Sequence, residues 1–253
     1  GALAAVIYNS EPGLFGGTLR ERGLIPAVSI SLEDGEAILL LMSADDVEAT
    51  VVVAATLVES QNVIAEKPGA DGDDRVVVLG GHYDTVEDVP GANDNGAGIA
   101  TLISIASEIS DTTYPFTVRF IAFGSEELGL LGSGFYVASL STEEQEAIVA
   151  MLNFDALGTG DVVGLLGAFD LSKKIEDYGR ENGIPAERRP TLGRGLSSDH
   201  ASFLRAGIPI VFFLADDISR IHTPEDTLEF VQPELMGNSA ALAVFLLDSL
   251  REP

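Results

Sequence analysis

The chain has 253 residues, enough for one large α/β domain, and its 40 acidic and 14 basic residues give a formal net charge of −26. Such a negative chain repels the phosphate backbone of nucleic acid, so no nucleic-acid partner is expected. The hydrophobic residues, 46% of the chain, can fill a sizeable core, but no apolar run reaches the ~18 residues that a membrane span needs.

The low lysine content, together with this acidity, points to a particular ionic environment. Lysine occurs only at Lys67, Lys173 and Lys174. In high salt, screening confines the repulsion between surface charges to a few Å, so an acid-rich, lysine-poor surface is tolerated there. We therefore hypothesise that the chain is adapted to high salt.

Residues 1–60 differ in character from the remainder. Short apolar runs at residues 2–8 and 27–30 are separated by turns rich in Gly and Pro. Ser31 followed by acidic residues predicts the start of a helix, and residues 47–58, rich in Val, Ala and Thr, predict an extended β segment. No cluster of His or acids with site-like spacing occurs in these residues, so we expect a small, β-rich accessory module.

From residue 61 onward, predicted strands alternate with predicted helices. The strands are residues 61–67, 75–80, 116–123, 147–154 and 208–214, and the helices are residues 95–110, 130–140, 172–182 and 233–250. This alternation predicts an α/β fold with a mixed, mainly parallel sheet between helices. If residues 47–58, 61–67 and 75–80 pair as neighbours, they form one flank of that sheet.

A glycine-rich stretch, residues 80–98, follows the second of these strands and contains His82, Asp84 and Asp94. His82 and Asp84 should lie just past the carboxyl end of the strand, the edge where open α/β sheets bind ligands. The chain has no cysteine, so any metal must be held by His, Asp and Glu, which suit zinc, manganese or cobalt. The stretch is therefore predicted to hold a metal.

Other predicted strands also end in metal-ligating residue types. Glu126-Glu127 follow the third strand, Asp155 follows the fourth, and His222 lies on the loop after the last. Apolar strands usually end in turn residues. Several strands that each deliver His, Asp or Glu to one sheet edge therefore predict a shared site.

The charges of these residues favour two metal ions. Asp94, Glu127 and Asp155 supply three negative charges, which two divalent ions and a bridging hydroxide bring to neutrality. Paired metals usually share a bridging carboxylate. Asp94 is the natural bridge because it lies in the same loop as His82.

A series of motifs, in order along the chain, carries a resemblance to a known family. The motifs are Gly81-His82-Tyr83-Asp84, residues 91–98, residues 125–133, Asn153-Phe154-Asp155, Ser198-Asp199-His200 and residues 222–227. Together, over residues 61–253, they resemble the dizinc aminopeptidases of peptidase family M28, which implies the zinc exopeptidase fold. The resemblance implies that His82 and Asp155 hold one Zn²⁺, that Glu127 and His222 hold the other, and that Asp94 bridges. Co²⁺ or Mn²⁺ could replace the zinc.

For catalysis, the resemblance implies that Glu126 is the general base and that Asp84 orients His82. The activity would be hydrolysis of N-terminal residues from peptides with a free N-terminus, through a metal-activated water. A cis peptide is expected after the bridging aspartate, at Asp94–Asn95. The resemblance also implies a secreted or extracytoplasmic protein, although the start of this chain has no signal peptide.

Three alternatives stay open. Two are enzymes on the same fold, a carboxypeptidase and a single-zinc glutaminyl cyclase, and the third is a non-catalytic binding protein. The complete set of ligand types and Glu126 disfavour the third. The walls of the substrate pocket are expected from loops at residues 157–169 and 192–203. Side-chain preference and oligomeric state are not readable from the sequence.

Residues 1–60 resemble the second half of a protease-associated (PA) domain, a module often inserted in such peptidases. The matching pieces are residues 1–9, 16–19 and 25–31. We therefore expect a partial PA-like domain at residues 1–60 and the peptidase domain at residues 61–253. On this interpretation the chain begins within a domain, and it is either a fragment or processed piece of a longer protein or a chain of which part is missing from this sequence.

The high-salt hypothesis predicts that the free energy of unfolding rises with ionic strength, because screening relieves the repulsion among the acidic side chains. Denaturant curves between ~0.05 M and ~2 M KCl measure this dependence. Full stability at the low end of that range would contradict the hypothesis.

Overall fold

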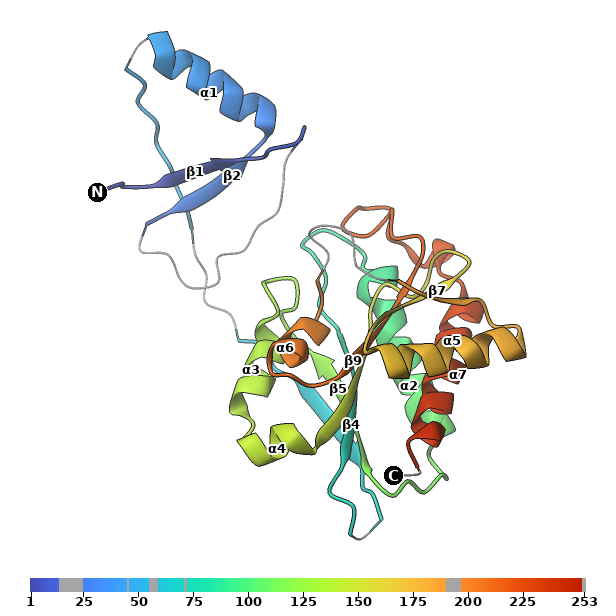
Figure 1. The fold of residues 1–253 in the computed structure, drawn as a ribbon. Helices are drawn as coiled ribbons and strands as arrows, with labels where there is room; N and C mark the ends of the chain where they lie inside the picture. The colour runs from blue at the N-terminus through green and yellow to red at the C-terminus, as the bar shows by residue number, and fades with distance from the viewer. Residues whose placement is uncertain (14–24, 45, 55–58, 71, 190–196, 252–253) are drawn as a thin grey trace. The chain divides into compact units, whose positions relative to one another are not determined.

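The computed structural model describes residues 1–13, 25–44, 46–54, 59–70, 72–189 and 197–251. They form two compact units, Gly1–Glu59 and Ser60–Pro253 (Figure 1). In the first unit, strands β1 (Ala5–Tyr8) and β2 (Ala27–Ile30) pair in parallel, and helix α1 (Leu32–Ala44) follows. The Ser31 hydroxyl accepts a hydrogen bond from the Asp34 backbone N–H at 3.1 Å, so the predicted helix start is confirmed.

The predicted β segment at residues 47–58 is wrong for the part that is described. Residues 47–54 form no strand, and residues 55–58 lie outside the described residues. Val52 is 85% exposed, and β propensity alone does not make a strand without a neighbour to pair with. Residues 16–19, one piece of the PA-like pattern, also lie outside the described residues. The likeness of the first unit to a PA domain stays a prediction.

The second unit is built on a seven-stranded sheet with the order β3-β5-β4-β6-β9-β7-β8. Strand β3 runs antiparallel to β5 and β7 runs antiparallel to β9, whereas the other neighbours are parallel. The predicted mainly parallel sheet is therefore confirmed. The strands are β3 (Val63–Lys67), β4 (Val76–His82), β5 (Thr117–Phe123), β6 (Ile148–Phe154), β7 (Val163–Gly167), β8 (Ala186–Arg188) and β9 (Ile210–Ala215).

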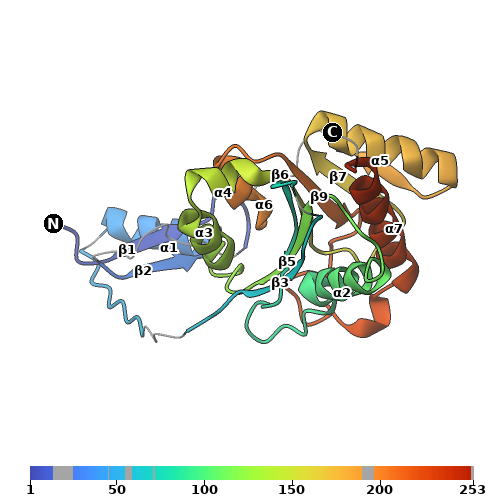
Figure 2. The same ribbon diagram turned by 90° about the horizontal axis from the view of Figure 1, so that it is seen from below.

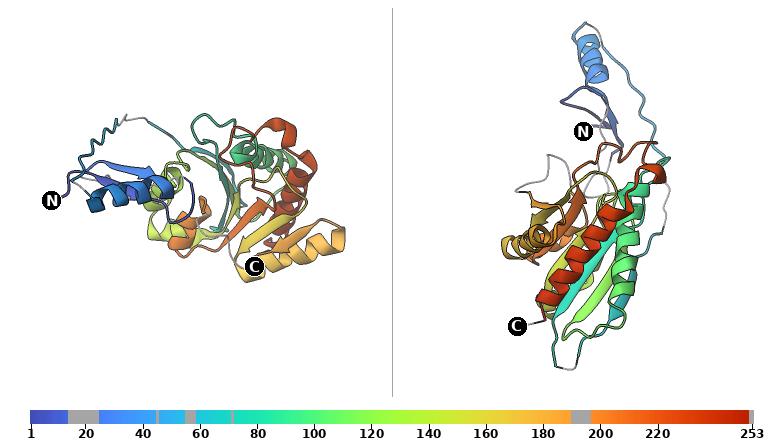
Figure 3. Two further views of the ribbon diagram at one scale, coloured as in Figure 1. Left: turned by 90° about the horizontal axis from the view of Figure 1, so that it is seen from above. Right: turned by 90° about the vertical axis from the view of Figure 1, so that its right-hand side faces the viewer.

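Helices cover both faces of this sheet (Figures 2 and 3). On one face lie α2 (Gly98–Glu108), α5 (Phe169–Asn182) and α7 (Pro233–Ser249), and on the other lie α3 (Leu131–Ser139), α4 (Thr142–Ala147) and α6 (His200–Arg205). Short turns η1 (Ala92–Ala97) and η2 (Leu228–Phe230) lie in the connections. The sequence analysis missed α4, α6, β7 and β8, which are too short for a clear hydrophobic period. Within the described residues, each helix is too short or too polar to cross a membrane.

Strand β4 separates the two halves of the core. Val77 and Leu79 pack in the cluster that includes Ile105 of α2, whereas Val78 packs in the cluster that includes Phe203 of α6. All three β4 side chains are fully buried. Because β4 is buried on both faces of the sheet, it suits an interior position rather than an edge, and β5 and β6 are its neighbours.

The expected pairing of residues 61–67 with residues 75–80 is wrong. Strand β3 pairs with β5 instead, in the register that places Glu66 opposite Arg119. Their side chains form an ion pair at 2.6 Å. Ile64 is 48% exposed, so β3 has the character of an edge strand, and both sides of β4 are already occupied.

This topology places the ends of four adjacent strands at one edge. Strands β5, β4, β6 and β9 are parallel neighbours, with His82 opposite Phe123 and Phe154 opposite Phe213. Residues that directly follow β5 and β6 must therefore emerge beside His82, which ends β4.

Gly98, the first residue of α2, provides a test of the close contact between this helix and the end of β6. An added Cβ would overlap the Asn95 side chain and lie 2.5 Å from the Phe154 carbonyl oxygen, whereas one at Gly237 of α7 meets nothing within 4 Å. We expect Gly98→Ala to lower the free energy of unfolding by about 1–3 kcal/mol. Gly237→Ala should raise it by up to about 1 kcal/mol, because alanine is the better helix former. Urea denaturation of both metal-free variants measures this; equal stability of the two would contradict the packing.

Candidate metal centre

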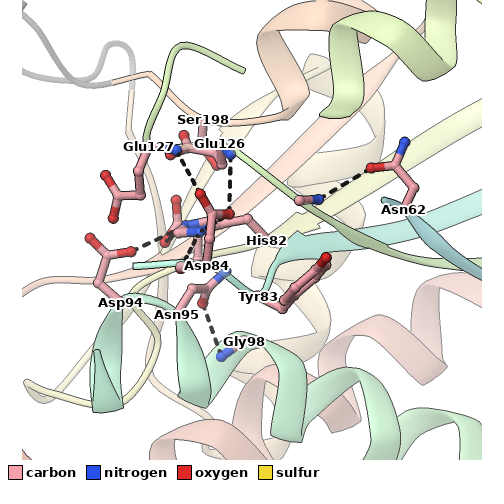
Figure 4. A network of polar contacts seen from close by, with 12 residues as sticks. Asn62, His82, Tyr83, Asp84, Asp94, Asn95, Gly98, Glu126, Glu127 and Ser198 are labelled. Atoms are coloured by element: carbon pink, nitrogen blue, oxygen red, sulfur yellow. Dashed lines mark hydrogen bonds and ion pairs between the residues drawn. The ribbon is translucent and has the colours of Figure 1, made fainter. Parts of the chain in front are cut away.

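Two histidines and three carboxylates meet at the carboxyl edge of the sheet, and Figure 4 shows His82, Asp94 and Glu127 among them. The His82 Nε2 atom lies 3.1 Å from Asp94 Oδ1 and 3.4 Å from Asp155 Oδ1. The His222 Nε2 atom lies 3.1 Å from Asp94 Oδ2 and 3.3 Å from Glu127 Oε2. In the described part of the chain these residues form two groups whose ligand atoms all lie within 4.8 Å of one another, and Asp94 belongs to both. The structure therefore brings together all five residues that the sequence analysis singled out as ligands.

The tautomer of His82 leaves its Nε2 atom free to bind a metal. The Nδ1 atom lies 3.0 Å from the backbone carbonyl oxygen of Asp84. A carbonyl only accepts hydrogen bonds, so Nδ1 must carry the hydrogen. In the neutral ring the lone pair on Nε2 then faces the Asp94 and Asp155 carboxylates. This orientation is favourable only if a cation lies between the ring and the carboxylates or if Nε2 is protonated.

The carboxylates hold both histidines in the protonated state when no metal is bound. Burial lowers the pKa of His82, but Asp155, Asp84 and Asp94 outweigh burial and hold that pKa well above its usual value. Hydrogen bonds that the His222 ring donates to Asp94 and Glu127 raise the pKa of His222 to about 10. The site thus attracts positive charge, whether from protons or from metal ions.

The residues present fit a divalent metal. When His82 is neutral and its hydrogen is on Nδ1, Oδ1 of Asp94, Oε1 of Glu127 and Oδ1 of Asp155 are buried and have no hydrogen-bond partner among the described residues. Unpartnered buried carboxylate oxygens are rare in folded proteins. Oxygen and imidazole nitrogen donors in this combination are ordinary zinc ligands. A bound cation would therefore satisfy the three oxygens.

Glu126 lies beside both groups. It is 8% exposed and lines a pocket together with His82 and Asp155. Burial raises the pKa of Glu126 to about 9, and the charges of Asp155, Asp199 and Glu127 add to this effect while His82 opposes it. In the metal-free protein this raised pKa keeps the Glu126 carboxyl protonated at neutral pH, so its use as a general base requires bound cations that offset the neighbouring negative charges. With His82 and Glu127 it also forms a third possible ligand group.

Asp84 holds the backbone of the two glutamates. Its Oδ1 accepts a hydrogen bond from the Glu126 N–H at 3.1 Å, and its Oδ2 accepts one from the Glu127 N–H at 3.2 Å (Figure 4). The carboxylate is farther from His82, at 3.6 Å from Nδ1. The resemblance implied only that Asp84 orients His82, which its backbone carbonyl does.

Asp226 is a site residue to which the sequence analysis assigned no role. It is 2% exposed, and its carboxylate accepts hydrogen bonds from the backbone N–H groups of Asn93 at 2.7 Å and Asp94 at 3.0 Å. Its backbone carbonyl accepts a third from Ala92 at 3.2 Å. Asp226 therefore ties the loop of His222 to the loop of Asp94. Its sequence signals are its place in the motif at residues 222–227 and its position four residues after a candidate ligand.

The loop of Asp94 is also tied to the sheet. The Asp94–Asn95 peptide bond is cis, as the resemblance implied. The Asn95 side-chain amide donates to the Phe154 carbonyl at 2.9 Å, and its carbonyl accepts from the Gly98 N–H at 3.1 Å. Asn95 thus connects the start of α2 to the last residue of β6.

The pocket over the candidate metal centre has one apolar wall, formed by Phe212, Leu214, Ile218 and Ile221. These residues belong to β9 and the loop that follows it. Of the loops expected to form the walls, only residues 192–203 contribute to the pocket, through Ser197, and residues 192–196 lie outside the described part of the chain. The apolar sequence of β9 predicts that its side chains lie in the core. Nothing in that sequence shows which of these side chains line a pocket.

Comparisons with known proteins agree on one family. The model of Peptidase family M28 matches residues 62–247. Aminopeptidase YwaD of Bacillus subtilis is 35% identical over 258 residues, which are 96% of this chain and 56% of YwaD. Leucine aminopeptidase 2 of Trichophyton equinum is 33% identical over 262 residues, which are 96% of this chain and 50% of that protein. This chain thus spans about half the length of such curated relatives.

Solved structures show the same similarity. An aminopeptidase from Aneurinibacillus sp. strain AM-1 superposes with a TM-score of 0.80 at 32% identity, covering 99% of this chain and 64% of that one. BSAP, a zinc aminopeptidase from Bacillus subtilis, superposes with a TM-score of 0.74 at 28% identity, covering 98% of this chain and 64% of that one.

Zinc binding to the metal-free protein should release two protons from the histidines at neutral pH, because both histidine pKa values are raised and zinc binds only the neutral ring, and up to one more from Glu126, whose raised pKa the cations would lower. Zinc affinity should therefore rise with pH toward the raised pKa values and fall as the pH is lowered. Titration calorimetry in two buffers of different ionisation enthalpy counts the protons. Zinc affinity that is independent of pH would contradict these protonation states.

Proposed function

Because the chain belongs to peptidase family M28, we propose that it is a dizinc aminopeptidase that removes N-terminal residues from peptides. One observation carries the proposal: two groups of ligands, one with each histidine, share the Asp94 carboxylate. A shared carboxylate with one oxygen toward each histidine suits a pair of ions better than a single ion.

We assign His82 and Asp155 to one Zn²⁺, Glu127 and His222 to the other, and Asp94 to both. The grouping of the side chains supports this assignment, and so does the charge balance, since three carboxylates match two divalent ions and a hydroxide. When bound, the zinc pair would polarise the peptide carbonyl and lower the pKa of the attacking water.

Glu126 acts as the general base in this proposal. It accepts a proton from the attacking water and then gives it to the amine that leaves when the peptide bond breaks. Its position in the pocket supports this role. A carboxylate that binds metal cannot also carry the proton, so neighbouring Glu126 and Glu127 divide the two tasks. Asp84 fixes their relative position through both backbone N–H groups.

The pocket supports a substrate with a free α-amine and an apolar N-terminal side chain. Because the metal ions balance the three ligand carboxylates, the ionised Glu126 leaves a negative charge that attracts a cationic amine, and the apolar residues that line the pocket suit an aliphatic side chain. The names of relatives such as leucine aminopeptidase 2 point the same way.

The alternatives fit the pocket less well. A carboxypeptidase needs a cation to bind the terminal carboxylate of its substrate, and no Lys or Arg is among the described residues that line the pocket. A single-zinc cyclase would leave one of the two ligand groups that share Asp94 without a metal.

We expect the zinc-loaded chain to hydrolyse leucine p-nitroanilide but not its N-acetylated form, and to bind two zinc ions. Release of p-nitroaniline and metal analysis measure these properties. Cleavage of C-terminal residues from an N-blocked peptide, or cyclisation of N-terminal glutamine with one zinc bound, would refute the proposal.

In the same assay, Glu126→Gln should keep both zinc ions and lower kcat by about 10²–10⁴-fold, because the amide cannot accept the proton. The matched control is Glu181→Gln, an exposed residue of α5, which should leave kcat unchanged. Near-normal turnover of Glu126→Gln would overturn the assignment of the base.

A further inference from the structure

The loop at residues 124–130, between β5 and α3, carries both Glu126 and Glu127. Gly124 begins this loop, and its backbone contacts Gly132 in the first turn of α3. A Cβ added at Gly132 would overlap the Gly124 carbonyl oxygen and lie 2.9 Å from the Gly124 nitrogen. Such a close backbone approach leaves no room for a side chain, so glycine is required at residue 132.

The Asn62 side chain joins the start of this loop to the first turn of α3. Its amide nitrogen donates to the Gly132 carbonyl at 2.9 Å, and its amide oxygen accepts from the Gly124 N–H at 3.2 Å. The second bond is drawn in Figure 4. Because the carbonyl can only accept and the N–H can only donate, the two partners determine the orientation of the amide. Asn62 precedes β3 and is remote in sequence from both glycines.

The loop backbone needs such support. Ser125 has a φ of 58° and Leu130 a φ of 60°. Non-glycine residues rarely adopt this left-handed conformation, and they keep it only where the surroundings enforce it. Ser125 and Leu130 lie on either side of the two glutamates. Asp84 accepts hydrogen bonds from the two glutamate N–H groups at the middle of the loop, and Asn62 joins the start of the loop to the first turn of α3.

Asn62 is itself anchored to the end of β4. The Tyr83 hydroxyl donates to the backbone carbonyl of Gln61 at 2.8 Å, and the Tyr83 N–H donates to the Phe123 carbonyl at 3.0 Å. Tyr83 directly follows His82. The residues before β3 and the loop of the two glutamates are thus positioned against the same strand ends as the candidate ligand.

We propose that Asn62 is a positioning residue that keeps Glu127 in place as a metal ligand and Glu126 in place as the base. This inference rests on the proposed function. The two metal positions should respond differently to the loss of Asn62, because Glu127 ligates only one of them. Loss of Asn62 should therefore weaken the ion held with His222 and spare the ion held by His82 and Asp155.

Asn62→Ala tests the inference through three measurements. In the metal-free protein, amide hydrogen exchange of residues 125–131 should become about tenfold faster. The dissociation constant of the zinc held by Glu127 and His222 should rise about 10–100-fold while that of the zinc held by His82 and Asp155 stays unchanged. For leucine anilide, kcat should fall about 10–100-fold with little change in KM, because the base is displaced.

Two further variants and a control sharpen the test. Asn62→Asp keeps the acceptor for Gly124 but loses the donor to Gly132, so its effects should be intermediate. Gly132→Ala disturbs the same contact, and its effect on kcat should not multiply with that of Asn62→Ala. The control is Asn182→Ala, which removes an exposed side-chain hydrogen bond to Tyr178 at the end of α5 and should change none of the three measurements.

Unchanged exchange in the loop, or faster exchange with unchanged zinc affinities and kcat, would overturn the role of Asn62. If Asn62→Ala does not fold, Asn62→Asp and Gly132→Ala carry the same test. A native chain that hydrolyses no amino-acid anilide would instead refute the proposed function, and the exchange and zinc affinities would still decide whether Asn62 positions the loop.

Discussion

The site depends on the contacts of the Asp94 carboxylate with two histidines. Its Oδ1 lies 3.1 Å from His82 Nε2, and its Oδ2 lies 3.1 Å from His222 Nε2. Asp94 is only 4% exposed, and Asp155 and Glu127 lie on either side of it. Burying several negative charges together is costly unless positive charge and hydrogen bonds compensate. Protons on the histidines compensate in the metal-free protein, and metal ions would do so in the active one.

The loops that carry the site are held by side chains that bind backbone groups of other loops. Asp226 binds two N–H groups of the Asp94 loop. Asp84 binds two N–H groups of the loop with Glu126 and Glu127. Each clamp comes from a loop that also carries a candidate ligand, so the loops order one another. Because the loops are already ordered, binding of metal and substrate would not carry the further free-energy cost of ordering them.

The acidic residues of the site link protonation, metal binding and, in the proposed aminopeptidase, substrate choice. Metal ions would balance the carboxylates that raise the pKa values of His82 and His222, and the ionised Glu126 would attract a cationic substrate amine. The same pocket is lined by Phe212 and Ile221, which can contact a substrate side chain but offer no charge for a terminal carboxylate. On this proposal, the charges that surround the pocket would select the peptide end.

The sequence by itself determined the α/β class and the candidate ligands, because both follow from local patterns. Apolar strands ending in His82, Glu126-Glu127 and Asp155 are visible along the chain, and parallel strands share an edge. The pairing of β3 with β5, the apolar wall on β9, and the clamps made by Asn62 and Asp226 are decided only in the tertiary structure. The bond from Asp94 to Asp226 spans 132 residues, and no local propensity records a partner so distant. An acid or an amide in a loop has the same sequence signature whether it faces water or holds a neighbouring loop in place.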